Sequence, residues 1–94
     1  MAAGYDQVAT AIVRGQMKLM GDVALSLARK VSDVTVADTG DTVVSGNGEA
    51  AIEGIVKEYS SLTGNLGVKM CFNFAKDELQ RNPGVQVPSF ASLR

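Results

Sequence analysis

Four carboxylates gather in one short stretch of the chain, and they are the residues with the clearest capacity for chemistry. They are Asp33, Asp38, Asp41 and Glu49. Carboxylates can act as general acids and bases or bind hard cations. The chain has no histidine, so the commonest general base and metal ligand is missing. No spacing among the four acids fixes a catalytic pair. A carboxylate-dependent or phosphate-handling enzyme is therefore the least favoured of the three functional hypotheses, and the two others are given below.

Two partial motif matches fall in this acidic stretch. Residues 36–40, Val-Ala-Asp-Thr-Gly, resemble the start of the catalytic loop of retroviral-type aspartic proteases, an all-β family. Asp41 follows where that family usually has a small residue. Residues 38–49 have the length and end residues of a calcium loop, but Val43 stands where the sharp turn needs glycine. We therefore interpret the Asp-Thr-Gly segment as an ordinary turn.

A glycine-containing loop follows, made of Ser45, Gly46, Asn47 and Gly48. Backbone N–H groups at the start of a helix can bind an anion. The loop is neither a Walker A sequence nor a dinucleotide-binding fingerprint. Glu49 adds a negative charge that would compete with a phosphate. Capping of the next helix by Asn47 is the favoured interpretation, and anion binding by the loop is the alternative.

Cys71 is the only cysteine, so an intrachain disulfide is excluded and a reducing, cytoplasmic compartment is expected. Without histidine there is no Cys–His pair to activate the thiol. Its neighbours Met70, Phe72 and Phe74 indicate burial, which raises a thiol pKa and makes it inert. We expect a core residue at this position rather than a nucleophile.

Composition narrows the class of protein further. The chain has 94 residues, 46% hydrophobic and 20% charged, which predicts a single globular domain over residues 1–94. The net charge is −1 and the basic residues are spread along the chain, so no nucleic acid partner is expected. No apolar run reaches the roughly 18 residues of a membrane span, and no signal-peptide pattern begins the chain. We expect no cofactor and no metal site.

The longest regular pattern predicts one helix over residues 6–31, about 39 Å long. Its apolar stripe consists of Val8, Ile12, Leu19, Val23, Leu27 and Val31, flanked by Val13, Met17, Met20, Ala24 and Ala28. Gly15 and Gly21 lie inside this pattern. They indicate either a slight bend or the close approach of another backbone.

The rest of the chain predicts an α+β fold. A β-hairpin is expected at 33–38 and 41–45, and two strands alone need support from a helix. Helices over 49–62 and 66–81 form an αα-hairpin, separated at Gly64, and we expect the second to be the most buried helix. The tail, through Val85 and Val87, is expected either to add an edge strand or to remain loose.

The leading functional hypothesis is a non-enzymatic, self-associating interaction or regulatory module, with a protein partner or a second copy of itself. A homodimer is expected, in which helix 6–31 of each copy pairs across a two-fold axis near Gly15 and Gly21. A Gly21→Leu change should then weaken the dimer, or stabilise the helix if Gly21 merely faces solvent.

The second hypothesis is a binder of a small apolar ligand in a pocket between the first helix and the C-terminal helices. Methionine and phenylalanine adapt well to apolar ligands. The candidate lining residues are Met17, Met20, Met70, Phe72 and Phe74. The same residue types would also fill an ordinary core.

Overall fold

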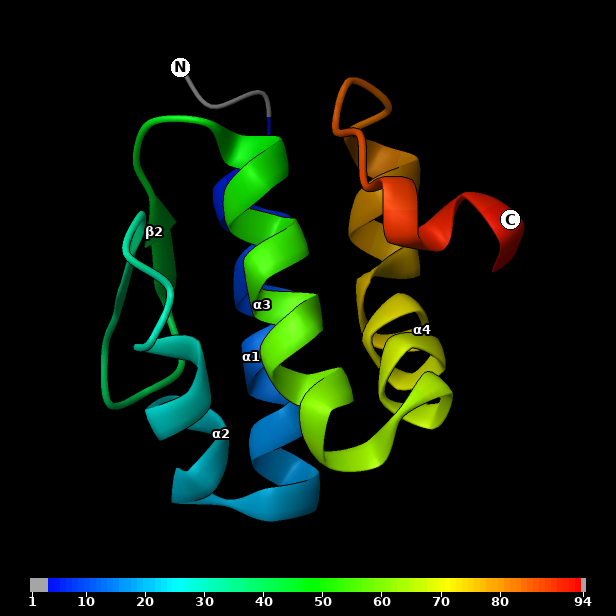
Figure 1. Cartoon of the computed structure of the whole chain (residues 1–94). Coiled ribbons are helices and arrows are strands. Elements are labelled where there is room, and N and C mark those ends of the chain that lie inside the picture. The colour runs from blue at the N-terminus through cyan, green and yellow to red at the C-terminus, as the bar shows by residue number, and fades with distance from the viewer. Residues whose placement is uncertain (1–3, 94) are drawn as a thin grey trace.

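The computed structural model describes residues 4–93, so the ends of the predicted 1–94 domain lie outside the described residues. The helices are α1 (Tyr5–Met20), α2 (Asp22–Ala28), α3 (Gly48–Thr63), α4 (Asn65–Arg81) and a final 3-10 helix, η1 (Pro88–Leu93). The strands are β1 (Val34–Val36) and β2 (Thr42–Val44). The predicted α+β class is confirmed (Figure 1).

The helices α1 and α3 lie side by side and run in the same direction, and α4 returns beside both (Figure 1). The β-ribbon covers one side of α1 through β2. The core between these elements is largely aliphatic, with Ile12, Ile52 and Ile55 fully buried. Tyr59 and Phe90 are the largest side chains that the core encloses completely.

The predicted helix over 6–31 is wrong, because the chain turns sharply at Gly21 and divides it into α1 and α2. Gly21 has φ 60° and ψ −136°, a backbone conformation that glycine adopts at little cost. Its N–H donates to the Met17 carbonyl (2.8 Å), and its carbonyl accepts from the Ala24 N–H (3.1 Å). The molecule is 29 Å in its longest dimension, too short for a straight helix of about 39 Å.

The junction between α3 and α4 repeats this geometry at Gly64, which has φ 64° and ψ −142°. Its N–H donates to the Ser60 carbonyl (2.6 Å), and its carbonyl accepts from the Gly67 N–H (3.0 Å). The predicted break at Gly64 is therefore confirmed. We call the junctions at Gly21 and Gly64 the two glycine corners.

The β-ribbon is antiparallel, with Val34 opposite Val44 and Val36 opposite Thr42. Both strands are shorter than the predicted 33–38 and 41–45. Val36, Thr42 and Val44 are buried against the helices. Within the described residues the sheet has two strands, and it lies on α1, which fits the expectation that a helix must support it.

The tail forms neither the edge strand nor the loose segment that its sequence suggested. Val85 and Val87 are buried, Phe90 is fully buried, and η1 follows in place of a strand. The Glu53 carboxylate on α3 accepts from the Ser89 N–H (3.1 Å) and from the Ser89 hydroxyl (2.8 Å). These bonds and the buried side chains fasten the tail across α3 and α4.

The expectation that the helix over 66–81, now α4, is the most buried helix is also wrong. Along α4 the buried residues form a narrow stripe, consisting of Gly67, Cys71, Ala75 and Leu79. Phe72 and Phe74, which flank this stripe around the helix, are only half-buried. Within residues 4–93, no helix combines the length and apolar content that crossing a membrane requires.

Candidate functional site

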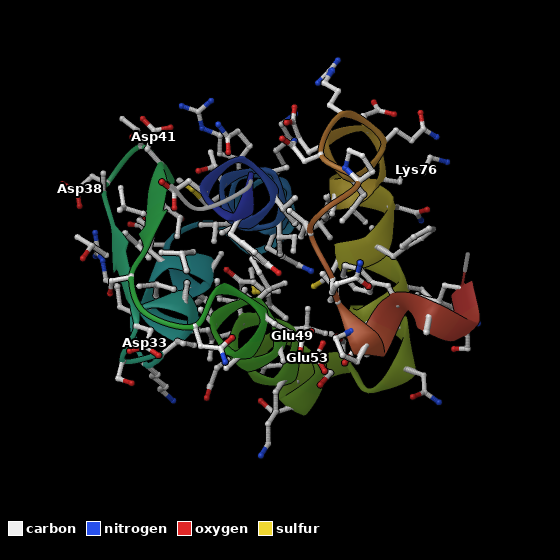
Figure 2. All side chains as sticks on the ribbon, turned by 90° about the horizontal axis from the view of Figure 1, so that it is seen from above. Asp33, Asp38, Asp41, Glu49, Glu53 and Lys76 are labelled. Atoms are coloured by element: carbon white, nitrogen blue, oxygen red, sulfur yellow. The ribbon has the colours of Figure 1, made fainter. Side chains whose placement is uncertain are left out.

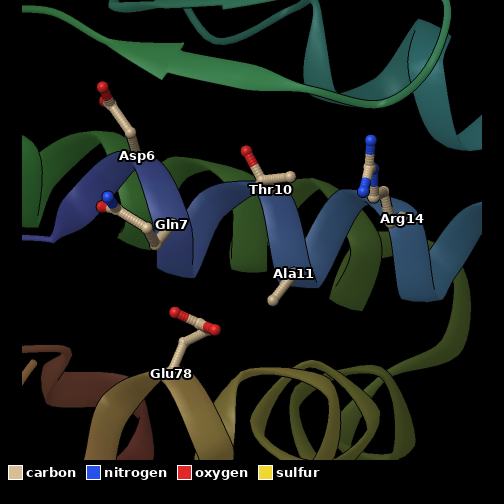
Figure 3. Close-up of a pocket in the computed structure, with 6 residues that line it drawn as sticks. All are labelled: Asp6, Gln7, Thr10, Ala11, Arg14 and Glu78. Atoms are coloured by element: carbon tan, nitrogen blue, oxygen red, sulfur yellow. The ribbon is translucent and has the colours of Figure 1, made fainter. Parts of the chain in front are cut away.

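A shallow groove of about 370 Å³ with a mostly polar lining lies between α1 and α4. Figure 3 shows its side chains, five of which come from α1 and one from α4. The lining residues are Asp6, Gln7, Thr10, Ala11, Arg14 and Glu78. Two carboxylates, a hydroxyl and a guanidinium in one groove make it the natural place to look for chemistry.

The polar groups nearest β2 are hydrogen-bonded to its backbone. The Asp6 carboxylate accepts from the Val44 N–H (2.7 Å). The Thr10 hydroxyl accepts from the Thr42 N–H (2.9 Å) and donates to the Thr42 carbonyl (3.2 Å). Because β2 has β1 on one side only, these bonds satisfy the backbone groups on its other edge. Asp6 and Thr10 therefore fasten the ribbon to α1.

The other two charged groups of the groove are also engaged within the chain. Arg14 lies 2.7 Å from the Asp41 carboxylate in the ribbon turn. Glu78 forms an ion pair with Arg81, one turn further along α4. These side chains stabilise the fold through their own partners, and their arrangement offers no unpaired acid and base for catalysis.

The structure does not bring the four predicted carboxylates together. Asp38 pairs with Arg29 (2.9 Å), whereas Asp41 pairs with Arg14 on a different helix. Figure 2 shows Asp33, Asp38 and Asp41 spread along the ribbon edge, with Glu49 at the start of α3. In the described part of the chain, no three acidic or thiol ligands meet closely enough to hold a metal ion.

The Asp-Thr-Gly segment builds the ribbon turn. The Gly40 N–H donates to the Ala37 carbonyl, and the Ala37 N–H donates to the Asp41 carbonyl, both at 2.9 Å. Gly40 has φ 92°, which favours glycine. The interpretation of this segment as a turn is confirmed.

The loop of Ser45, Gly46, Asn47 and Gly48 caps α3. The Asn47 side chain accepts from the Ala50 N–H (3.0 Å), so the predicted N-cap is confirmed. The Ser45 N–H and hydroxyl both donate to the Asp33 carbonyl, at 2.8 and 3.2 Å. Asp33 on one side and Glu49 on the other surround the loop with negative charge. Anion binding at this loop stays a prediction, and these charges oppose it.

The three methionines of the proposed apolar pocket occupy separate places. The Met17 sulfur lies against Gly40, so closely that a Cβ on Gly40 would come within 2.7 Å of it. Met20 is half-buried against the core beside the first glycine corner. Met70 is half-buried on α4. Met17 therefore fills the contact between α1 and the ribbon turn rather than a ligand pocket.

The two phenylalanines of that set lie on different faces of α4. Phe74 covers Gly15 of α1, where an added Cβ would lie 2.1 Å from the ring. Phe72 instead packs edge-to-face on Phe90 of the tail, with ring centroids 5.4 Å apart. Gly15 is thus closed by its own chain, so a partner helix has no access to it.

Gly21 differs from Gly15 in every respect that matters for self-association. No atom lies within 4 Å of the place where its Cβ would be, and its φ is positive. The helix stabilisation expected if Gly21 merely faces solvent does not apply to Gly21→Leu, because a side chain at this positive φ strains the corner itself. Gly15 is closed to a partner, whereas self-association at Gly21 stays a prediction.

Cys71 is fully buried, and the Gln16 amide donates to its sulfur (3.4 Å). Burial raises the pKa of the thiol to about 11, although the hydrogen bond from Gln16 acts in the opposite direction. The nearby Tyr59 hydroxyl donates to the Ala24 carbonyl (2.9 Å), and burial raises its pKa as well. These groups are held neutral in the core, as predicted for Cys71.

The surface that the sequence analysis missed lies at the two glycine corners. Among residues 4–93, four of the five exposed large hydrophobic side chains flank these corners. They are Leu19 (57% exposed), Val23 (51%), Leu62 (58%) and Leu66 (62%). Both corners lie at the same end of the molecule (Figure 1). We call these four residues the corner end.

A sequence signal for the corner end exists, although it is short. Residues 19–23 read Leu-Met-Gly-Asp-Val, and residues 62–66 read Leu-Thr-Gly-Asn-Leu. Each has an apolar residue two positions before the glycine and two positions after it. The apolar stripe predicts Leu19 and Val23 in the core, because its helical period runs through Gly21 as if the helix continued.

Comparison of the chain with known proteins gives no further information on function. It matches no protein family model, no curated protein and no solved structure. Any functional conclusion therefore has to come from the chain's own surfaces.

Proposed function

We propose that this protein is a non-enzymatic, self-associating interaction or regulatory module that forms a homodimer through the corner end. The single observation that supports this is the concentration of exposed apolar side chains at the two glycine corners. Isolated exposed leucines are normal on protein surfaces, but clustered ones mark interaction sites. A second copy of the chain is the occupant that we propose.

The size of the protein supports the same conclusion. A chain of 94 residues buries only about 60–65% of its unfolded surface, so its core gives modest stability. A second copy that covers the four residues of the corner end would stabilise the dimer by roughly 25 cal/mol for each Å² of apolar surface removed from water. These residues are Leu19, Val23, Leu62 and Leu66. Association therefore supplies a stabilising term that the monomer lacks.

The charges beside the corners support a two-fold arrangement in which unlike corners meet. Asp22 and Lys18 are both exposed at the first corner, and Lys69 is exposed on α4 after the second. If the first corner of one copy faces the second corner of its partner, Asp22 and Lys69 are opposed twice. Unlike charges around an apolar centre fit the usual anatomy of an interface and fix its orientation.

Sedimentation equilibrium over a series of protein concentrations tests the proposal. The wild-type protein should dimerise, and a Leu62→Gln, Leu66→Gln double variant should weaken the dimer at least about tenfold, equivalent to 1.4 kcal/mol. Val43→Gln is the matched control, because Val43 is equally exposed but lies on the ribbon. A wild-type monomer at every concentration, or an equal effect of Val43→Gln, would overturn the proposal.

A reducing, cytoplasmic setting belongs to this proposal as well. The only thiol is buried and hydrogen-bonded, so self-association needs no disulfide.

The remaining alternative, a binder of small apolar ligands, is favoured by one specific observation, a hollow beside Phe72.

A further inference from the structure

We infer that one face of α4, beside its contact with the C-terminal tail, carries a binding site for a small apolar monocarboxylate. The site is a hollow of about 370 Å³, which we call the α4 notch. It is lined by Phe72, Lys76, Leu79, Gln80 and Pro83. This inference is independent of the homodimer proposed above, because the corner end lies elsewhere on the surface.

The notch results from helical spacing along α4. The other three α4 residues of the notch follow Phe72 by four, seven and eight positions. At this spacing all four share one face of the helix; they are Phe72, Lys76, Leu79 and Gln80. Pro83 closes this face just after the helix ends at Arg81. The volume falls within the range of roughly 300–1,000 Å³ that is usual for small-molecule sites.

The apolar walls of the notch are held in place. The Phe72 ring is fixed by edge-to-face contact with Phe90, which is fully buried. Leu79 is anchored in the core and is only 7% exposed. A pocket whose walls need little rearrangement loses less conformational entropy when a ligand binds.

The loop that carries Pro83 is pinned on both sides. Before it, the Asn82 N–H and side-chain amide both donate to the Glu78 carbonyl, at 2.9 and 2.8 Å. After it, the Val85 N–H donates to the Asn82 carbonyl (3.0 Å). Pro83 itself has a fixed φ, so its ring is a rigid rim for the notch.

The charge of the notch is a single cation. Lys76 forms no ion pair with any residue of the described chain, whereas Arg14, Arg29 and Arg81 each have an acidic partner. Asp77 follows it in sequence, but adjacent residues on a helix do not face each other. Figure 2 shows Lys76 on the opposite side of the molecule from Asp38 and Asp41.

These features together specify the ligand's chemistry. Phe72, Leu79 and Pro83 suit an aliphatic or aromatic body, and the Lys76 ammonium suits one negative group. The Gln80 amide can donate to the second oxygen of a carboxylate. Two other hollows include lysines, but the one with Lys57 also holds the Glu53 carboxylate, which repels an anion. Lys57 therefore serves as the matched control.

The test is a titration of the full chain followed by amide resonances in ¹H–¹⁵N correlation spectra, with hexanoate as the probe and hexan-1-ol as its uncharged counterpart. Hexanoate should shift the amide resonances of residues 72–83. Lys76→Gln should weaken its binding at least about fivefold, the loss expected for one partly exposed charge-assisted contact. Lys57→Gln should leave the affinity unchanged. Lys76 and Lys57 are both exposed, so neither variant should affect folding.

Four results would overturn the inference. The first is the absence of any hexanoate-dependent shift, and the second is a set of shifts confined to residues outside 72–83. The third is equal binding of hexanoate by the wild type and Lys76→Gln, and the fourth is binding of hexan-1-ol as tight as that of hexanoate. In either of the last two cases the lysine stem only covers an apolar stretch of α4.

Discussion

The side of α1 that faces the ribbon and the corner end have opposite characters. On the ribbon side, polar groups that look fit for chemistry are all bonded within the chain, through Asp6, Thr10 and Arg14. At the corner end, ordinary apolar residues such as Leu62 and Leu66 are more than half exposed. The difference teaches that, in this protein, a residue's partners indicate its role better than its chemical type does.

The comparison also has an energetic side. Removing one partner of an internal hydrogen bond leaves a buried polar group unsatisfied and costs about 1–3 kcal/mol. Replacing an exposed leucine costs the monomer little, usually within about 0.5 kcal/mol. Substitutions on the two surfaces should therefore separate stability from association.

The largest effect on stability is expected at the contact between α1 and α4. Gly15→Ala places a Cβ 2.1 Å from Cγ of Phe74, so the ring or the helix must shift. We expect the free energy of unfolding to fall by about 3 kcal/mol, the upper end of overpacking costs. Urea denaturation measures it. Gly84→Ala, where no atom lies within 4 Å, should be near neutral, and an equal loss in both variants would contradict the packing argument.

A pH dependence of similar size is expected from the buried thiol. The pKa of Cys71 is raised from about 9 to about 11, so above pH 9 the unfolded chain releases a proton that the folded chain retains. Stability is therefore fully present below pH 9 and falls as pH rises to 11, by about 1.4 kcal/mol for each pKa unit. Urea denaturation of wild type and Cys71→Ala across this range measures the difference. Parallel pH curves for the two proteins would show that Cys71 is not the cause.

A smaller loss is expected where the ribbon is fastened to α1. Thr10→Val keeps the shape of the side chain but leaves the Thr42 N–H and carbonyl without their partner on α1. The free energy of unfolding should fall by about 2 kcal/mol. Thr35→Val on the exposed face of β1 is the control and should change stability by less than about 0.5 kcal/mol. If Thr10→Val is as mild as its control, the ribbon does not depend on this contact.

The smallest of these effects is expected at the glycine corners. Gly21→Ala and Gly64→Ala each place a Cβ on a residue with positive φ, at a cost of about 1–2 kcal/mol. Open space surrounds both positions, so the cost is strain in the backbone alone. Thermal unfolding should show similar losses for the two variants. An increase in melting temperature for Gly21→Ala would mean that α1 and α2 can form one continuous helix.

The parts of the fold that depend on local chemistry were predictable from the sequence. Asn47 caps α3, Gly64 ends it, and the ribbon turn at Asp38-Thr39-Gly40 forms as expected. Gly15 and Gly21 show where local chemistry is insufficient. Both are glycines within one apolar stripe, yet Phe74 packs on the first and the chain turns at the second. Only contacts distant in sequence distinguish them.

The candidate sites were less predictable for the same reason. Asp38 and Asp41 lie close in sequence, but their partners come from separate segments, since Arg14 lies on α1 and Arg29 directly follows α2. The exposure of Leu19 and Val23 depends on the turn at Gly21, which the helical period of the stripe conceals. The short repeat around Gly21 and Gly64 was the available signal.

The central claim, association through the corner end, is tested most directly by ¹H–¹⁵N correlation spectra of the wild-type protein recorded during dilution. We expect the amide resonances of residues 18–23 and 61–67 to move as the dimer dissociates, while those of the ribbon at 33–45 stay in place. Spectra that do not change with dilution, or changes confined to the ribbon, would contradict the account.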